Sequence, residues 1–341
     1  MEEPFTIAYE TIDYTDNVFA LLSTDKGITG MGCVAPVAEV TGETVDSVME
    51  ILRDIAEPIV RGKDPLMLCA VIDELRRNSG NYPAAVALID MALCDIIGKM
   101  ADLPFYRLLG GGRHFIETSM TIGILPLDDA IRKARDMVRK GFTILKIKGG
   151  LNCEEDIEKL VTLRESLGRD IRLGFDANMG YTKDEGIRFG RATDHLGLAF
   201  IEQPTSKGDR GALGEIAREL STPVMADESL LTANDAFELA AEKAVDMLNV
   251  KISKVGGIRE TLAIDTIARE AGIGLMIGCM DESALGIAAG LHVALSLTNV
   301  VYADLDGHFG MIDDPAAGGV ICKHGVLHPV EKPGFGVTLN Y

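Results

Sequence analysis

The sequence has no excess of basic residues: Lys and Arg number 33 against 52 Asp and Glu, which gives a formal net charge of −19. A charge of this sign repels phosphate backbones and anionic membrane surfaces. We therefore expect neither a nucleic acid nor a membrane as a partner of this protein. The net charge carries no information about the chemistry of a buried site.

A secretion signal and long apolar runs are also missing. The first residues, Met1 to Pro4, contain no basic stretch followed by an apolar run, which a signal peptide requires. The apolar stretch 284–297 is interrupted by Gly and His and is shorter than a membrane span. We expect a cytoplasmic protein without a membrane-spanning segment.

Cysteines are few and widely separated, at positions 33, 69, 94, 153, 279 and 322. They form neither a Cys-x-x-Cys motif nor another spacing typical of a metal site. This pattern predicts reduced thiols that are buried as small hydrophobic side chains.

The composition that remains is that of a soluble globular protein, with 47% hydrophobic and 25% charged residues over 341 positions. Within the first hundred residues, a β-hairpin is predicted at 18–32, and helical spacing of apolar residues predicts helices at 44–60, 66–77 and 84–100. Three consecutive glycines at 110–112 end this pattern. We therefore place a first α+β domain at residues 1–112.

After this boundary, short β-branched runs alternate strictly with amphipathic helices at a period of about 25 residues. The eight predicted strands cover 118–122, 143–148, 171–176, 198–202, 223–227, 247–251, 274–278 and 300–304. Such alternation is typical of parallel strands joined by right-handed crossovers, and eight units favour a closed (β/α)₈ barrel at 113–312. An open doubly wound sheet is the alternative, but the Gly-rich turn expected after its first strand is missing. The segment 313–341, rich in Gly and Pro, is expected to pack back on the first domain.

Charged residues stand at or shortly after the ends of seven predicted strands, namely Lys148, Asp176, Glu202, Asp227, Lys251, Glu282 and Asp304. In a barrel these ends meet at the mouth where catalytic groups are found. Like charges cannot share a half-buried site without a cation. Asp176, Glu202 and Asp227 are therefore interpreted as ligands of a hard divalent ion such as Mg²⁺, and the absence of His or Cys at these ends argues against zinc.

Lysines on two predicted strands suggest proton transfer. Lys146 and Lys148 are two residues apart and point to one face of their strand, and Lys251 ends a strand nearly across the barrel. Lys254 is expected in the following loop. A lysine near a divalent cation and another ammonium group should have a lowered pKa and can act as a general base. Two such lysines could exchange a proton on opposite faces of a carbon next to a metal-bound carboxylate.

Five ordered motifs resemble the enolase superfamily and, within it, the muconate lactonizing enzyme subgroup. They are Lys146-Ile147-Lys148, Asp176-Ala177-Asn178, Glu202-Gln203-Pro204, Asp227-Glu228-Ser229 and the stretch 251–257, Lys-Ile-Ser-Lys-Val-Gly-Gly. The resemblance implies a modified (β/α)₈ TIM barrel under an α+β capping domain, with one Mg²⁺ per active site. It also implies Lys148 and Lys251 as the catalytic bases, with Lys146 as a cation beside the substrate carboxylate.

The pair Asp304 and Asp306 resembles the dipeptide epimerases of this subgroup, in which it binds the free α-ammonium of the substrate. The stretch 40–44 is also similar to their capping domain. The expected function is therefore Mg²⁺-dependent dipeptide epimerisation. The alternative function is that of another enzyme of the same fold: a lyase of the o-succinylbenzoate synthase or muconate cycloisomerase type, or an N-acylamino acid racemase. The structural alternative for the Asp pair is that it caps a helix.

Two further acids bear on the substrate. In Ala-Glu epimerases of the family, a basic residue in the loop after Pro-Phe contacts the glutamate side chain, and Glu10 takes that position here. Asp281 stands at the end of the seventh predicted strand. Together they predict a preference for cationic or neutral over acidic dipeptides, unless Glu10 is solvated and Asp281 pairs with a lysine. The expected partners are a small dipeptide and further copies of the chain in a homo-oligomer, whose subunit number, two or eight, stays open.

Overall fold

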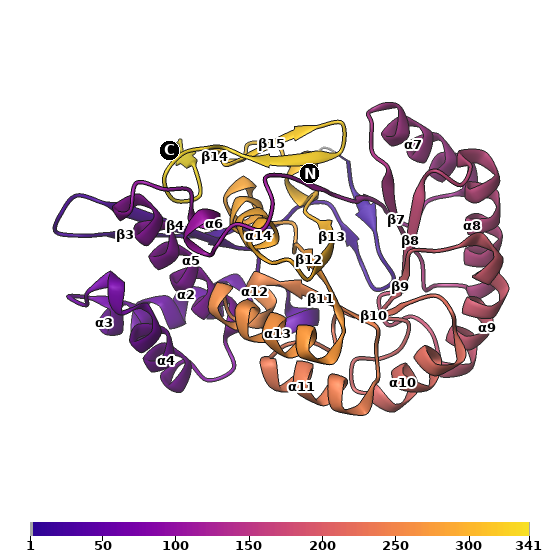
Figure 1. Ribbon diagram of the computed structural model, residues 1–341, viewed down its shortest axis with the longest axis horizontal. Helices are drawn as coiled ribbons and strands as arrows, with labels where there is room; N and C mark the ends of the chain where they lie inside the picture. The colour runs from indigo at the N-terminus through magenta and orange to yellow at the C-terminus, as the bar shows by residue number, and fades with distance from the viewer. Residues whose placement is uncertain (1–2, 341) are drawn as a thin grey trace.

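The computed structural model describes residues 3–340, so residues 1, 2 and 341 of the predicted terminal segments lie outside the described part. Its centre is a sheet of eight parallel strands that follow one another in chain order (Figure 1). The strands are β6 (Met120–Ile122), β7 (Ile144–Lys148), β8 (Arg172–Asp176), β9 (Phe200–Glu202), β10 (Val224–Ala226), β11 (Met247–Lys251), β12 (Gly274–Gly278) and β13 (Val300–Asp304). The Ser119 N–H donates to the Ala303 carbonyl at 2.8 Å and joins the first strand to the last. The predicted barrel is confirmed.

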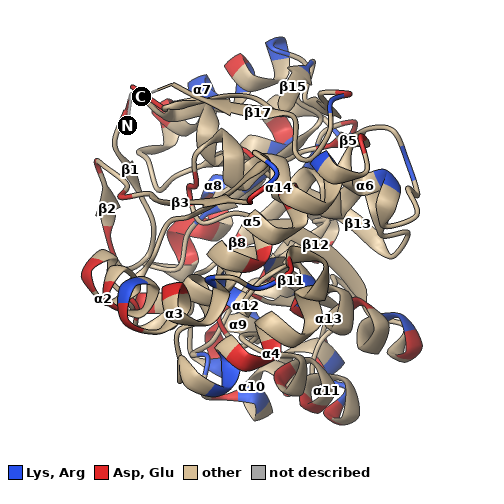
Figure 2. Ribbon diagram, turned by 90° about the vertical axis from the view of Figure 1, so that its left-hand side faces the viewer, with Lys and Arg blue, Asp and Glu red and all other residues tan. Residues whose placement is uncertain are grey.

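Helices surround this sheet (Figure 1). They are α7 (Leu127–Arg139), α8 (Cys153–Leu167), α9 (Lys183–Thr193), α10 (Arg210–Glu219), α11 (Ala233–Glu242), α13 (Ile258–Ala271) and α14 (Ala284–Ser296), with short turns α12 (Ile252–Val255), η3 (Asp194–Leu196) and η4 (Gly307–Gly310). Side-chain caps start several of them: Asn152 caps α8, and capping boxes begin at Thr182 and Thr232. Figure 2 shows acidic and basic positions spread over peripheral helices such as α10 and α11.

The first domain packs the hairpin β3 (Val18–Ser23) and β4 (Thr29–Val34) on the long helix α5 (Pro83–Met100). Glycines at 30 and 32 allow this contact, because a Cβ there would lie about 2 Å from carbonyl oxygens of α5. The remaining helical elements of the domain are α1 (Ala38–Thr41), α2 (Val45–Ile51), η1 (Leu52–Ala56), α3 (Glu57–Val60), η2 (Pro65–Met67), α4 (Leu68–Asn78) and α6 (Phe105–Leu108).

The single helix predicted at 44–60 is wrong in one respect. It is interrupted by the five-residue π-helical segment η1, after which α3 begins with Pro58 in its first turn. Proline has no N–H for the helical ladder and its ring clashes with the carbonyl four residues earlier, so the ladder widens before it.

Two buried carboxylates on α5 connect the first domain with the rest of the chain. Asp95 accepts hydrogen bonds from Met31 N at 3.0 Å and from Phe335 N at 2.9 Å. Asp90 accepts one from Ile258 N at 2.6 Å, at the start of α13. These contacts hold the first domain, the barrel and the C-terminal segment together.

A second, small hairpin, β1 (Phe5–Thr6) and β2 (Thr11–Ile12), lies over the carboxyl ends of the barrel strands (Figure 1). Ile124 N, just after β6, donates to the Thr6 carbonyl at 2.7 Å. On the other side, the Thr15 hydroxyl and the Asn17 amide both donate to the Asp281 carbonyl, at 3.3 and 3.4 Å. We call residues 5–17 the capping loop.

The C-terminal segment folds into β14 (Ala316–Gly318), β15 (Val320–Lys323), β16 (Val326–Pro329) and β17 (Val337–Leu339), with β16 pairing to β5 (Ile116–Glu117). Gly334 exchanges backbone hydrogen bonds with Leu103 and Phe105 of the first domain.

Over residues 3–340, no helix has the length and apolarity needed to cross a membrane. All six cysteines are free, but burial is wrong for Cys69, which is exposed, and only partial for Cys279 and Cys322.

Candidate active site

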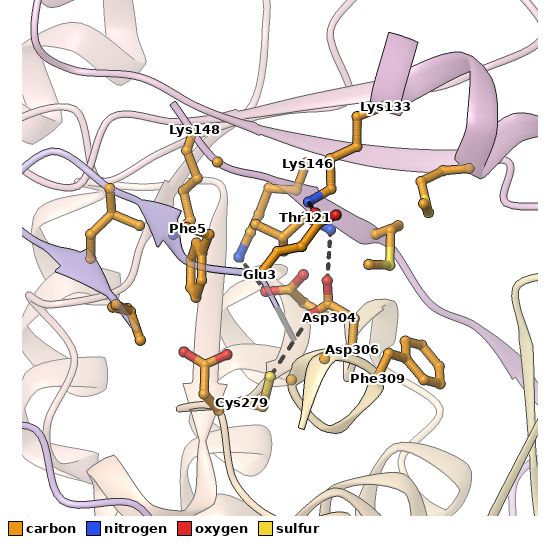
Figure 3. A pocket seen from close by; sticks show the side chains of 18 of the residues that line it. Glu3, Phe5, Thr121, Lys133, Lys146, Lys148, Cys279, Asp304, Asp306 and Phe309 are labelled. Carbon is orange, nitrogen blue, oxygen red and sulfur yellow. Dashed lines mark hydrogen bonds and ion pairs between the residues drawn. The ribbon is translucent and has the colours of Figure 1, made fainter. Parts of the chain in front are cut away.

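The strand ends and the capping loop enclose a cavity of about 780 Å³ at the barrel mouth. Lys146, Lys148 and Lys251 line it from the barrel, and Tyr9 and Glu10 line it from the capping loop. Figure 3 shows Lys146 and Lys148 extending from β7 into this space, with Phe5 of the capping loop beside them. Because β7 and β11 are separated by three strands in the eight-stranded sheet, Lys148 and Lys251 come from opposite sides of the barrel.

The three predicted metal ligands end adjacent strands and are almost completely buried. Asp176 and Glu202 are direct register partners, and Asp227 follows the next strand. Asp176 pairs with Lys148 at 2.6 Å, and Asp227 pairs with Lys251 at 2.8 Å. Within residues 3–340 no three His, Cys, Asp or Glu side chains form a group that could hold a metal ion. The three carboxylates lie in one region of the barrel mouth, where Asp176 and Asp227 each form an ion pair with a lysine.

The chemistry of these acids nevertheless suits a hard cation. Glu202 Oε2 is buried and has no hydrogen-bond partner among the described residues, and Lys146 Nζ is 3.7 Å away from it. Burial, with the neighbouring Asp176 charge, raises the pKa of Glu202 to about 8. Burial likewise raises the pKa of Glu228 to about 7, and no residue in the described part of the chain donates to Glu228 Oε2. Such acids need additional positive charge to stay ionised at neutral pH, and oxygen donors of this kind suit Mg²⁺.

The carboxylates around two of the lysines act against the expected lowering of their pKa values, which stays a prediction for the metal-bound site. Burial lowers the pKa of Lys251, but the carboxylates, led by Asp227, outweigh burial and hold the pKa well above its usual value. The same balance, led by Asp304, raises the pKa of Lys146. The predicted lowering of the lysine pKa values depends on the positive charge of a divalent cation. The surrounding carboxylates alone raise these pKa values.

Lys254 is a site residue that the sequence argument missed by assigning it to a loop. It lies in α12, is fully buried, and donates to the side chain and the backbone carbonyl of Asp227. It also donates to the Asn249 carbonyl at 3.0 Å. Its spacing of three residues from Lys251 could have indicated one turn of helix that returns the side chain to the mouth.

Three amide side chains around the acids were also missed. Gln203, with φ of +33°, accepts from Asp227 N at 2.9 Å and from Ser229 N at 3.1 Å. Asn249 donates to Glu202 at 2.6 Å, and Asn178 joins Lys148 to Glu228. Asn249 could have been found, since it precedes Lys251 by two residues and therefore shares its face of the strand.

Asp304 and Asp306 line the cavity together, close to Thr121 of β6 (Figure 3). Asp304 accepts from the Ser119 hydroxyl at 2.5 Å and pairs closely with Lys146. Asp306 accepts from Thr121 N at 2.6 Å, and burial, with the Asp304 charge, raises its pKa to about 7. Asp306 makes no capping hydrogen bond to the short turn η4 that follows it. The helix-capping alternative is therefore wrong for Asp306.

The two acids expected near the substrate side chain both line the cavity. Burial, together with Glu282, raises the pKa of Asp281 to about 6. Within residues 3–340, Asp281 makes no ion pair with a lysine. Glu10 is half-buried, and burial together with the exposed Glu39 raises its pKa. In the described part of the chain, neither acid forms an ion pair with a basic side chain.

Two family comparisons agree with this geometry. Residues 1–110 match the mandelate racemase/muconate lactonizing enzyme N-terminal domain, and residues 129–341 match the enolase C-terminal domain-like family. The chain belongs to the enolase superfamily, in its mandelate racemase/muconate lactonizing enzyme branch.

Its close relatives within that branch are dipeptide epimerases. The L-Lys-D/L-Arg epimerase of Desulforapulum autotrophicum is 40% identical over 99% of this chain and 95% of the relative. The dipeptide epimerase of Methylococcus capsulatus, solved with Mg and the dipeptide L-Arg-D-Lys, is 38% identical with a TM-score of 0.94 and covers 99% of this chain and 96% of its own. The L-Ala-D/L-Glu epimerase of Bacillus subtilis, solved with substrate, is 31% identical with a TM-score of 0.95, over 98% and 94% of the two chains.

Proposed function

We propose that this protein is a Mg²⁺-dependent dipeptide epimerase that inverts one α-carbon of its substrate. The observation that carries the proposal is the pair of buried lysines, Lys148 and Lys251, on opposite sides of a mouth that also holds three carboxylates. Opposed lysines serve proton transfer to both faces of one carbon, which a protein that only binds dipeptides does not need. The relatives named above carry out epimerisation, which supports the same reaction here.

Asp176, Glu202 and Asp227 are the residues that would hold Mg²⁺. When bound, the ion supplies positive charge for the negative charge that develops on the substrate carboxylate during deprotonation. Gln203, Asn249 and Lys254 fix the orientation of these acids through the hydrogen bonds described above.

The proton moves between two amines. One lysine, in its neutral form, takes the α-proton, and the electron pair of the broken C–H bond passes into the carboxylate group. The other lysine, protonated, gives its proton to the opposite face of the same carbon, and a new C–H bond forms. The roles of the two lysines exchange when the reaction runs backwards, because the acid of one direction is the base of the other.

Asp304 and Asp306 bind the α-ammonium of the dipeptide in this proposal, because two buried acids at one site attract a cation. Glu10 and Asp281 favour a cationic or neutral side chain and oppose glutamate by Coulomb repulsion. A close pair of charges at about 1 kcal/mol or more gives a selectivity of about tenfold or more. The L-Lys-D/L-Arg epimerases among the relatives support this preference.

The test is incubation of the protein with Mg²⁺ and the dipeptides Ala-Lys, Ala-Leu and Ala-Glu in D₂O, followed by mass spectrometry. We expect one deuterium at the inverted α-carbon, and kcat/KM for Ala-Lys at least about tenfold above that for Ala-Glu. Glu10→Arg should narrow or reverse this ratio. Glu50→Arg, the matched control at an exposed acid outside the cavity, should not.

Two results contradict the proposal at different levels. A native preference for Ala-Glu refutes the side-chain assignment of Glu10 and Asp281 but leaves epimerisation intact. A small carboxylate converted to a product with a new double bond, without deuterium exchange in any dipeptide, identifies the lyase alternative instead.

A further inference from the structure

One polar side chain at the barrel mouth has no part in the function described so far. Tyr9 stands at the tip of the capping hairpin, inside a tight turn in which Ile7 N donates to the Glu10 carbonyl at 2.9 Å. Pairing of β1 with β2 and the bond from Ile124 N to the Thr6 carbonyl fix this turn to the end of the first barrel strand. The backbone therefore presents Tyr9 to the cavity from the capping side.

The surroundings of the Tyr9 phenol are those of the reacting centre. Tyr9 lines the cavity together with Lys148, Lys251 and Asn178. The charged groups that act on it are, in decreasing order, Glu228, Lys251, Asp227 and Asp176. The capping loop thus brings one phenol close to the acids and the base that would handle the carboxylate end of the dipeptide.

The hydroxyl is available as a hydrogen-bond donor. Burial and the charge of Glu228 raise the pKa of Tyr9, so that the phenol stays protonated at neutral pH. Tyr106 and Tyr181 donate their hydroxyl hydrogens to Glu331 and Asp156, whereas within residues 3–340 the Tyr9 hydroxyl has no hydrogen-bond partner. Tyr9 is 37% exposed, so its hydroxyl is free to donate to an acceptor of a ligand that enters the cavity.

We infer that the Tyr9 hydroxyl donates a hydrogen bond to the carboxylate end of the bound dipeptide, and that it positions this end between Lys148 and Lys251. The inference rests on the proposed function, because it assigns a contact of that substrate. It makes the capping loop a direct binding element for the invariant carboxylate, in addition to the side-chain selection assigned to Glu10. The neutral phenol adds no charge and therefore serves cationic and apolar dipeptides equally.

A hydrogen bond from Tyr9 to Glu228 Oε2 is the competing role, since that oxygen is buried without a donor. In that case Tyr9 would fasten the capping loop to the barrel and would not contact the ligand. The two roles differ in whether the loss of the hydroxyl depends on the carboxylate of the ligand.

The experiment compares Tyr9→Phe with wild type by calorimetric titration of the full-length, Mg²⁺-loaded protein. The ligands are L-Ala-L-Lys and its C-terminal amide, which lacks the carboxylate. Tyr14→Phe is the matched control, because Tyr14 lies in the same loop and its side chain is 73% exposed. We expect Tyr9→Phe to weaken binding of the free dipeptide about tenfold and binding of the amide less than about twofold, with the Tyr14 variant unchanged.

The same tenfold loss is expected in kcat/KM for epimerisation, whereas the urea midpoint without ligand should not move. Equal affinity of Tyr9→Phe and wild type for the free dipeptide overturns the inference. An equal loss of affinity for the dipeptide and for its amide also overturns the inference. A lowered urea midpoint with unchanged affinity overturns it as well and assigns the Tyr9 hydroxyl to a hydrogen bond with Glu228. A wild-type protein that binds the dipeptide without epimerising it refutes only the proposed function, and one that binds no dipeptide refutes both.

Discussion

His292 should make the stability of this protein depend on pH between neutrality and mild acid. It is fully buried on α14, where Nδ1 accepts a hydrogen bond from Tyr106 N at 3.0 Å and Nε2 has no partner within residues 3–340. Burial lowers its pKa from 6.5 to about 3. The unfolded chain therefore binds a proton below pH 6.5 that the folded chain does not bind until about pH 3.

The sign follows from this difference: the unfolded state binds more protons, so stability rises with pH through this window and is lost as the pH falls. At pH 5 the two pKa values give a loss of about 2 kcal/mol in the free energy of unfolding relative to neutral pH. The variant His292→Asn keeps an oxygen acceptor for Tyr106 N but cannot take up a proton.

The assay is urea unfolding of wild type and His292→Asn at pH 7 and pH 5. Wild type should lose about 2 kcal/mol more than the variant over this interval, and the difference cancels the titration of all other groups. His195→Asn is the control, because His195 is an exposed histidine, and it should behave as wild type. Equal pH dependence in wild type and His292→Asn would refute the reasoning.

Three further predictions concern the site. Lys148→Ala and Lys251→Ala should each abolish epimerisation but should retain deuterium exchange, measured by mass spectrometry, from one epimer only. Exchange from both epimers in both variants contradicts the assignment of two lysine bases. Glu202→Ala should abolish turnover and leave the circular dichroism spectrum unchanged, because the site loses an oxygen ligand and its charge. Exhaustive chelation should also abolish turnover, and full activity of the chelated protein contradicts the metal assignment. Lys254→Met should lower the free energy of unfolding by about 1–3 kcal/mol, because buried acceptors lose their donor while Asp227 keeps its pair with Lys251. A urea curve like that of wild type would contradict this.

The sequence allowed the barrel to be predicted because each strand is a short β-branched run at a regular interval, and β11, β12 and β13 have the predicted bounds. The site acids and Lys148 could be found because parallel strands bring their carboxyl ends to one place. Lys254 could not be placed by this logic, since it reaches Asp227 from a helical turn after the strand. The sign of the lysine pKa shifts also depends on distances to several acids, which spacing along a chain does not contain.

The contacts of α5 limit how selectivity can be changed in this protein. In the proposed function the capping loop selects the side chain of the substrate and the barrel carries the lysines, so exchanging whole capping domains between relatives looks like a direct route to new substrates. However, Asp90 accepts the hydrogen bond of Ile258 N, and a Cβ at Gly257 would lie 2.8 Å from the Asp90 side chain. An incoming domain must therefore bring a carboxylate to this point, and the recipient barrel must keep its glycine. Single substitutions inside the cavity avoid this constraint, so new specificities are more accessible by point mutation than by recombination.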